Sequence, residues 1–250
     1  MSDALPFGHV APPAEAFRSS DDTAGLGDRQ VELARRTAFV RANTALGKPP
    51  HVPEIALHLA DEAHDLWLRT EEELAEIGLP PPFWAFAWAG GQGLARYVLD
   101  HPGEVRGRRV LDFASGSGLV AIAAVFVGAA EVRAVDVDPF ALAAARLNAA
   151  ANGVSLDVGS ADLVGEPVAA DVLLAGDVFY DRAFAERLTP WFDALTAAGT
   201  TILVGDPGRA YLPRGHVEAL AVYEVPVTRA LEDAEIKRTT VWRWRGVPPR

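Results

Sequence analysis

The sequence contains no cysteine. This absence excludes disulfide bonds, cysteine nucleophiles and thiolate ligands for zinc. No apolar run approaches the roughly 20 residues that a membrane-spanning helix needs. The first residues lack a basic start followed by an apolar core, so we expect no signal peptide, no membrane association and a cytoplasmic location.

Basic residues are also scarce, since 23 lysines and arginines stand against 34 acidic residues and give a net charge of -11. An acidic surface repels phosphate backbones, so we expect a basic, lysine-bearing partner rather than a nucleic acid. The chain has 250 residues, half of them hydrophobic. This length suits one α/β core and is too short for two large domains, and we expect a monomer.

The chain divides into three stretches by composition. Residues 1–27 are rich in proline, serine and aspartate without apolar periodicity, which predicts a flexible arm. Residues 28–100 contain apolar residues at helical spacing from Asp28 onwards, a second predicted helix at 70–77, and an aromatic, glycine-rich segment. Residues 101–250 form the predicted core domain.

Strands and helices alternate through the core. The strands are uninterrupted apolar runs, which is typical of a parallel sheet covered on both faces. Two strand-like runs near the C-terminus predict an antiparallel pair at the sheet edge. The fold class is therefore α/β, with strands expected at 109–113, 131–136, 156–158, 171–176, 200–205, 220–227 and 239–244, and helices at 94–99, 119–127, 140–152 and 183–198.

The first core strand runs into a turn of small residues and then a helix, from Val110 to Gly118. Such a turn brings backbone close to a ligand, and the helix N-terminus offers unpaired N–H groups to an anion. Asp136 follows the next strand, at the spacing where a carboxylate binds both hydroxyls of a ribose. The sequence therefore predicts a nucleotide site, although glycine-rich turns also occur without a ligand.

Two classes of nucleotide enzyme fit this turn. Gly116 to Ala121 matches the G-x-G-x-x-A pattern of NAD(P)-dependent oxidoreductases. Asp112 at the end of the first strand disfavours a pyrophosphate and suits the ammonium of a methionine. The predicted antiparallel tail also replaces the second mononucleotide-binding half that a dinucleotide fold requires.

Four segments narrow the assignment, namely FWAFAWAGGQ at 83–92, GDVFYD at 176–181, GDPGR at 205–209 and PEI at 53–55. The chain resembles the lysine methyltransferases that modify the β-subunit of electron transfer flavoprotein, which are class I, seven-strand, S-adenosylmethionine-dependent enzymes. The resemblance covers about residues 44–242, with Ala114 standing where the family usually has the first glycine of its nucleotide turn.

The resemblance implies S-adenosylmethionine as cofactor and electron transfer flavoprotein β-subunit as protein substrate. Another basic protein, such as a ribosomal protein, is an alternative substrate, and a non-catalytic cofactor-binding adaptor is an alternative role. Asp177 is expected to orient the acceptor lysine nitrogen and Tyr180 to supply a wall or a hydrogen bond. An N-cap role in the helix that begins near Ala183 is the competing interpretation of Asp177.

The remaining predicted site residues fall into two groups, and no metal site is expected. For Trp84, a role in the site and a role as a core aromatic are equally favoured. The expected substrate-binding residues are Trp84, Phe179, Asp206 and Arg209, and the expected cofactor-binding residues are Trp88, Asp112, Ala114, Ser115, Gly116, Gly118, Asp136, Val137, Asp162 and Asp177.

Overall fold

The computed structural model describes residues 21–60, 81–232 and 234–246. It consists of two units that divide after Arg35. Helix α1 spans Asp21–Ala42 and so begins earlier than the predicted start at Asp28. Residues 1–20 of the predicted arm and the predicted helix at 70–77 lie outside the described residues.

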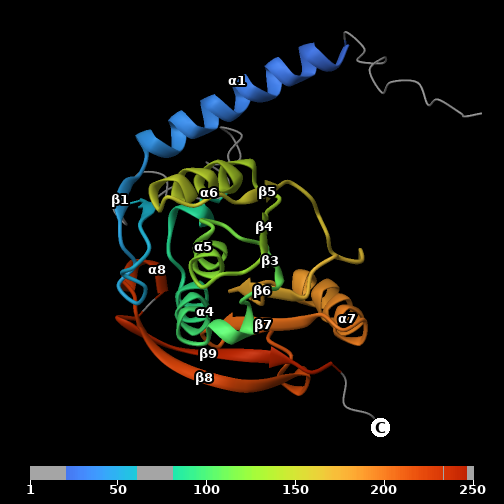
Figure 1. Cartoon of the computed structure of the whole chain (residues 1–250). Coiled ribbons are helices and arrows are strands. Elements are labelled where there is room, and N and C mark those ends of the chain that lie inside the picture. The colour runs from blue at the N-terminus through green and yellow to red at the C-terminus, as the bar shows by residue number, and fades with distance from the viewer. Residues whose placement is uncertain (1–20, 61–80, 233, 247–250) are drawn as a thin grey trace, which may run out of the picture. The chain divides into compact units, whose positions relative to one another are not determined.

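The second unit is built on a seven-stranded sheet with the order β5-β4-β3-β6-β7-β9-β8 (Figure 1). The first five of these strands are parallel, and β9 and β8 are antiparallel, as predicted. Strand order reverses between β3 and β6, which is where open α/β sheets bind ligands. The strands are β3 (Arg109–Phe113), β4 (Glu131–Val135), β5 (Asp157–Gly159), β6 (Val172–Gly176), β7 (Thr201–Asp206), β8 (Val217–Pro226) and β9 (Ile236–Trp244).

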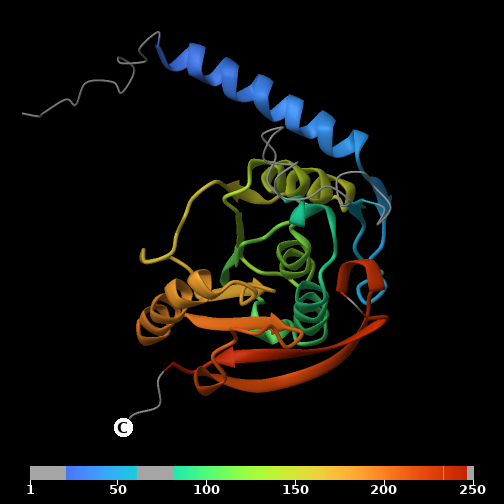
Figure 2. The ribbon, with the colours of Figure 1, turned by 180° about the vertical axis from the view of Figure 1, so that it is seen from behind.

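Helices cover both faces of this sheet, as the uninterrupted apolar strands predict. Alternate strand residues point to opposite faces, so Val110 packs with α4 and α5 whereas Leu111 and Phe113 pack with α7. Figure 2 shows α7 and the helices α4 to α6 on opposite sides of the strands. These helices are α4 (Ala89–Asp100), α5 (Leu119–Phe126), α6 (Pro139–Ala151) and α7 (Arg182–Ala197), and the short helices are η1 (Phe83–Ala85), η2 (Pro102–Glu104), η3 (Arg214–His216) and α8 (Arg229–Glu232). None of the helices in the described part of the chain is long and apolar enough to cross a membrane.

A small antiparallel pair, β1 (Ala45–Gly47) with β2 (Leu57–Leu59), was not predicted. Its attachment to α6 is made by two amide side chains. Asn148 Oδ1 accepts a hydrogen bond from the backbone N–H of His58 at 2.7 Å, and Asn152 Oδ1 accepts one from Ala56 at 2.9 Å. The N–H of Ala60 then donates to the carbonyl of Ala85 in η1 at 2.9 Å, so this pair helps to hold the aromatic segment in place.

Candidate active site

A cavity of about 460 Å³ opens at the carboxyl ends of β3, β4 and β6. Its base is the turn that follows β3, and its opposite wall is the aromatic segment that leads into α4. The cavity brings together most of the predicted site residues: Trp84, Trp88, Asp112, Ala114, Ser115, Gly116, Asp136, Val137, Asp177, Tyr180 and Arg209.

The turn after β3 takes a backbone course that few side chains permit. The φ angles of Ala114, Gly116 and Gly118 are 52°, 50° and 77°, all in the left-handed region. Gly118 is the N-cap of α5, and a Cβ there would lie 3.0 Å from the Cβ of Ala145. Gly118 therefore shapes the turn without lining the cavity, whereas Ala114 and Gly116 line it.

Carboxylates fix this turn to its neighbours. Asp136 accepts hydrogen bonds from the N–H groups of Gly116 at 2.8 Å and Asp138 at 2.9 Å. Asp112 is buried beneath α5 and accepts from the N–H of Ala121 at 3.0 Å. Burial raises the pKa of Asp136, and it raises the pKa of Asp112 well above the usual range.

Asp138, which lines the cavity, was missed by the sequence analysis. It is the N-cap of α6 and accepts from the N–H of Phe140 at 2.8 Å. Burial raises the pKa of Asp138 to about 6, and the neighbouring carboxylate of Asp136 adds to the rise. The Asp-Pro at 138–139 is a recognised helix start, so the capping role was readable from the sequence.

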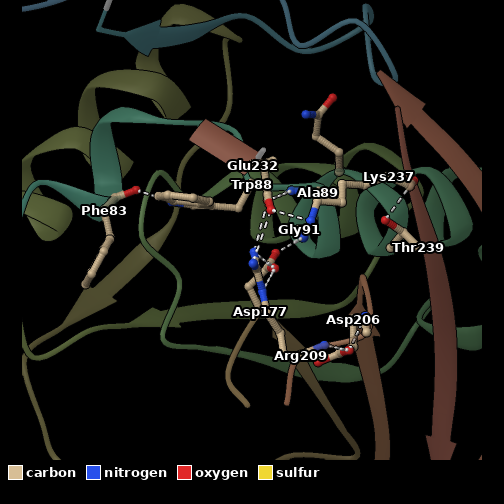
Figure 3. Close-up of polar contacts among 12 residues, drawn as sticks. Phe83, Trp88, Ala89, Gly91, Asp177, Asp206, Arg209, Glu232, Lys237 and Thr239 are labelled. Carbon is tan, nitrogen blue, oxygen red and sulfur yellow. Dashed lines mark hydrogen bonds and ion pairs between the residues drawn. The ribbon is translucent and has the colours of Figure 1, made fainter. Parts of the chain in front are cut away.

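Aromatic side chains form the wall opposite the turn. Trp84 is buried and stacks on Phe140, with ring centroids 6.4 Å apart. Trp88 donates its indole N–H to the carbonyl of Phe83 at 2.9 Å, which ties the segment into a compact bend (Figure 3). Phe86, which was not among the predicted site residues, lies in the same wall.

The cavity suits the adenosine and methionine parts of S-adenosylmethionine. Asp136 presents a carboxylate beside the glycine turn, where a ribose is expected. The hydroxyl oxygen of Ser115 is buried in the wall and has no hydrogen-bond partner among the described residues. A buried orphan hydroxyl costs free energy unless a ligand satisfies it, so the residues present fit this cofactor.

Asp177 lies at the end of β6, where the cavity meets the N-terminus of α4 (Figure 3). Its Oδ2 accepts from the N–H of Gly91 at 2.9 Å, and its Oδ1 lies 2.6 Å from Nη2 of Arg209. The φ of Asp177 is 57°, a strained value for a residue with a side chain. Burial raises the pKa of Asp177 to about 6, against the opposing effect of Arg209.

Close backbone packing places α4 against Asp177. A Cβ on Gly90 would collide with Asp177 and with the carbonyl oxygen of Gly205, and a Cβ on Gly176 would lie 2.9 Å from the Cα of Gly91. Glycines on α4, β6 and β7 therefore let the positive end of the helix approach the carboxylate. The predicted helix start at Leu94 is wrong for this reason, because α4 begins at Ala89 and includes these glycines.

The competing interpretation of Asp177 as a helix N-cap is wrong. Helix α7 starts at Arg182, and its N-cap is Asp181, whose side chain accepts from the N–H of Phe184 at 2.8 Å. Tyr180 lies at the cavity rim, 53% exposed, with its ring 5.8 Å from that of Phe83.

Besides Gly118, three predicted residues lie away from the cavity. Phe179 is fully buried and stacks on Trp244. Asp206 is buried and accepts from the N–H groups of Gly208 and Arg209, so it shapes the turn after β7. Asp162 lies outside the cavity and pairs with Arg187 at 2.8 Å. Within the described residues, no group of three or more His, Asp or Glu side chains is placed to hold a metal ion.

The comparisons with known proteins agree with this geometry. Residues 97–179 match the model of the ribosomal protein L11 methyltransferase (PrmA) family. A Xenopus laevis electron transfer flavoprotein β-subunit lysine methyltransferase is 38% identical over 82% of this chain and 85% of its own length. The Homo sapiens protein of the same name is 33% identical over 82% of this chain and 80% of its own length.

A crystal structure from Thermoplasma acidophilum shares the fold, with a TM-score of 0.50 at 20% identity over 62% of this chain and 89% of that one. The sheet is the class I methyltransferase sheet that the resemblance implied. The relatives are methyltransferases, which supports the methyltransferase class over the oxidoreductase alternative. The chain belongs to the family of electron transfer flavoprotein β-subunit lysine methyltransferases.

Proposed function

We propose that this chain transfers a methyl group from S-adenosylmethionine to a lysine side chain of the electron transfer flavoprotein β-subunit. One observation carries the proposal. The carboxylate of Asp177, whose side chain is 12% exposed, lines the same cavity as the turn of Gly116 and the ribose-site carboxylate of Asp136, so an acceptor site adjoins a nucleoside site. Family membership supports the choice of lysine and of the protein substrate.

The two ends of the cofactor half of the cavity bind different parts of S-adenosylmethionine. Asp136 holds the ribose hydroxyls, and Asp112 and Ser115 face the methionine end. When bound, S-adenosylmethionine supplies an electrophilic methyl group on its sulfonium. Trp88, whose ring centroid lies 5.9 Å from the guanidinium carbon of Arg209, excludes water from the space beside Asp177, which favours the desolvated state that an attacking amine needs.

Asp177 positions the acceptor. A carboxylate binds the incoming lysine ammonium but also raises its pKa, which starts near 10.4. The amine must lose its proton before it attacks, so the aromatic surroundings, which lower that pKa, oppose the effect of Asp177. Water receives the proton, and Asp177 orients the nitrogen.

Methylation of the purified substrate tests the proposal. Recombinant electron transfer flavoprotein β-subunit is incubated with the enzyme and labelled cofactor, and the product is mapped by mass spectrometry. Methylated lysine is expected with the parent enzyme. Asp177→Ala is expected to lose about a hundredfold or more in rate, as misplacement of a nucleophile does, while its affinity for S-adenosylhomocysteine stays close to that of the parent.

Two results would contradict the proposal. A parent enzyme that binds S-adenosylhomocysteine but methylates no protein fits the non-catalytic adaptor instead. Methylation of ribosomal protein L11, with none of the flavoprotein subunit, fits the alternative substrate. The match to the L11 methyltransferase model covers residues 97–179, which include the nucleotide turn and Asp177 and omit Arg209 and the C-terminal strands, so it supports the cofactor half and only part of the acceptor half.

A further inference from the structure

Glu232 is a buried carboxylate beside the acceptor half of the cavity. It ends α8, in the connection between β8 and β9, and its side chain is 2% exposed. Its carboxylate faces the guanidinium of Arg209, the N–H of Ala89 at 3.3 Å and the ammonium of Lys237 at 3.8 Å (Figure 3). Glu232 thus joins α8, the turn after β7, the start of α4 and β9.

The guanidinium of Arg209 is shared unequally between two carboxylates. Its Nη1 and Nη2 donate to the two different oxygens of Glu232, at 3.1 Å and 3.0 Å. Its Nε and Nη2 both donate to the single oxygen Oδ1 of Asp177, at 3.0 Å and 2.6 Å. The two-oxygen fork, which is the stronger geometry for a carboxylate, therefore belongs to Glu232.

This division leaves the second oxygen of Asp177 available. Oδ2 accepts the N–H of Gly91, and a carboxylate oxygen has lone pairs for more than one hydrogen bond. Two negative charges also share the one guanidinium, so Asp177 keeps more of its attraction for a cation than it would in a closed pair with Arg209.

Resting on the proposed function, we propose that Glu232 is a positioning residue for the acceptor lysine. It holds the terminal nitrogens of Arg209, so that the guanidinium does not close on both oxygens of Asp177. Asp177 then meets the substrate ammonium through Oδ2. A purely architectural Glu232 would fasten α8 to α4 and have no effect on how Arg209 meets Asp177.

Glu232→Gln is the variant that separates these roles. The amide keeps the size of the side chain and one oxygen acceptor, whereas truncation would also empty the space that the side chain fills and leave the buried N–H of Ala89 without its acceptor. Glu235→Gln is the matched control, because Glu235 lies in the same connection, is exposed, and pairs with Arg229 at 2.9 Å. Melting temperature is measured on both variants to verify folding.

Three readouts are expected to change together. The kcat/KM of Glu232→Gln for the acceptor protein falls about tenfold or more, as loss of a charged hydrogen bond implies, while its S-adenosylhomocysteine affinity and the control variant are unchanged. The acid limb of its pH–rate profile moves to lower pH. The charged groups that face Asp177 are Arg209 and Glu232, and loss of the Glu232 charge lowers the pKa of Asp177. A crystal structure of Glu232→Gln shows Arg209 bonded to both oxygens of Asp177.

The crystal structure keeps this proposal separate from the proposed function. If Arg209 still reaches only Oδ1 of Asp177 in Glu232→Gln, the inference is overturned, whatever the activity. It is also overturned if an active parent and the variant share the same kcat/KM and the same acid limb. An inactive parent whose variant shows the rearranged Arg209 contradicts the proposed substrate and leaves the role of Glu232 in the network supported.

Discussion

At the scale of single residues, Ala114 is under backbone strain in the cofactor turn. Its φ of 52° costs an alanine about 1–2 kcal/mol, whereas glycine adopts it freely at an entropic cost of about 0.5–1 kcal/mol. We therefore expect Ala114→Gly to leave stability unchanged or raise it by up to about 1 kcal/mol, measured by urea unfolding.

The matched control is an exposed alanine in a regular helix. Ala150 lies in α6, and Ala150→Gly is expected to lower stability by about 1 kcal/mol. A loss of the same size in both variants would show that Ala114 is not strained.

The titration of Asp177 sets a second expectation. Burial raises its pKa to about 6, so the carboxylate takes up a proton as the pH falls through that value. The acceptor lysine also has to lose a proton, which alone gives the logarithm of the rate a slope of about 1 against pH, and protonation of Asp177 steepens that slope to about 2 below pH 6.

The cofactor must be saturating in this measurement, because Asp138 also has a pKa of about 6 and lines the cofactor half of the cavity. Stability has the opposite dependence. The pKa of each of these two carboxyl groups is higher in the folded protein than in the unfolded chain. The contribution of each group to stability is therefore greatest at low pH and is lost as the pH rises through about 6. A slope that stays near 1 down to pH 5 would remove Asp177 from the reaction.

At the scale of elements, the sequence predicts what repeats along the chain and misses what depends on distant partners. The central strands and α5 to α7 were placed within a few residues, because the strands and α5 are apolar runs, α6 and α7 have apolar residues at helical spacing, and turn residues separate them. The pair β1 and β2 was missed because it lies outside the alternation of strands and helices that predicted the equally short β5. The start of α4 was missed because Gly90 and Gly91 disfavour a helix locally. The reason for these glycines is their close packing against the ends of β6 and β7, which the local sequence does not reveal.

Those adjacent glycines provide a matched test of this packing. Gly90→Ala places a methyl group against Asp177 and the backbone of Gly205, so we expect a loss of 2 kcal/mol or more, on the order of a severe overpacking. A Cβ on Gly91 meets nothing within 4 Å, so Gly91→Ala is expected to be neutral or to stabilise α4 by up to about 1 kcal/mol. Denaturant unfolding of the two variants compares them, and equal effects would refute the close approach.

At the scale of the whole molecule, charge complements the proposed substrate. The chain carries a net charge of -11, and an acidic enzyme attracts a lysine-bearing surface over a distance set by ionic strength. We expect kcat/KM for the acceptor protein to fall as salt rises from 50 to 300 mM, roughly the range over which screening becomes strong, with kcat almost constant. The affinity for S-adenosylhomocysteine serves as the control, and a salt-independent kcat/KM would contradict electrostatic steering.

Only part of the candidate site could be predicted from the sequence, because some of its residues have a local pattern and others depend on contacts with distant residues. Gly116, Asp136 and Asp177 sit at strand ends, where local pattern and chain order already indicate a ligand. Glu232 carries no such signal, because its role comes from a contact with Arg209 across the sheet edge. Phe179 shows the converse, since its place in a recognisable motif suggested a contact that its burial against Trp244 does not provide.

The glycines that seat α4 have a consequence for how this enzyme varies under selection. A Cβ on Gly90, Gly176 or Gly205 would in each case collide with backbone atoms of a facing segment, and shortening a nearby side chain such as Asp177 would not remove that backbone contact. A second substitution cannot relieve a clash at any of these three glycines, so we expect all three positions to remain glycine in a library selected for folding. Gly91, although it lies beside Gly90, should accept alanine and serine freely in the same library.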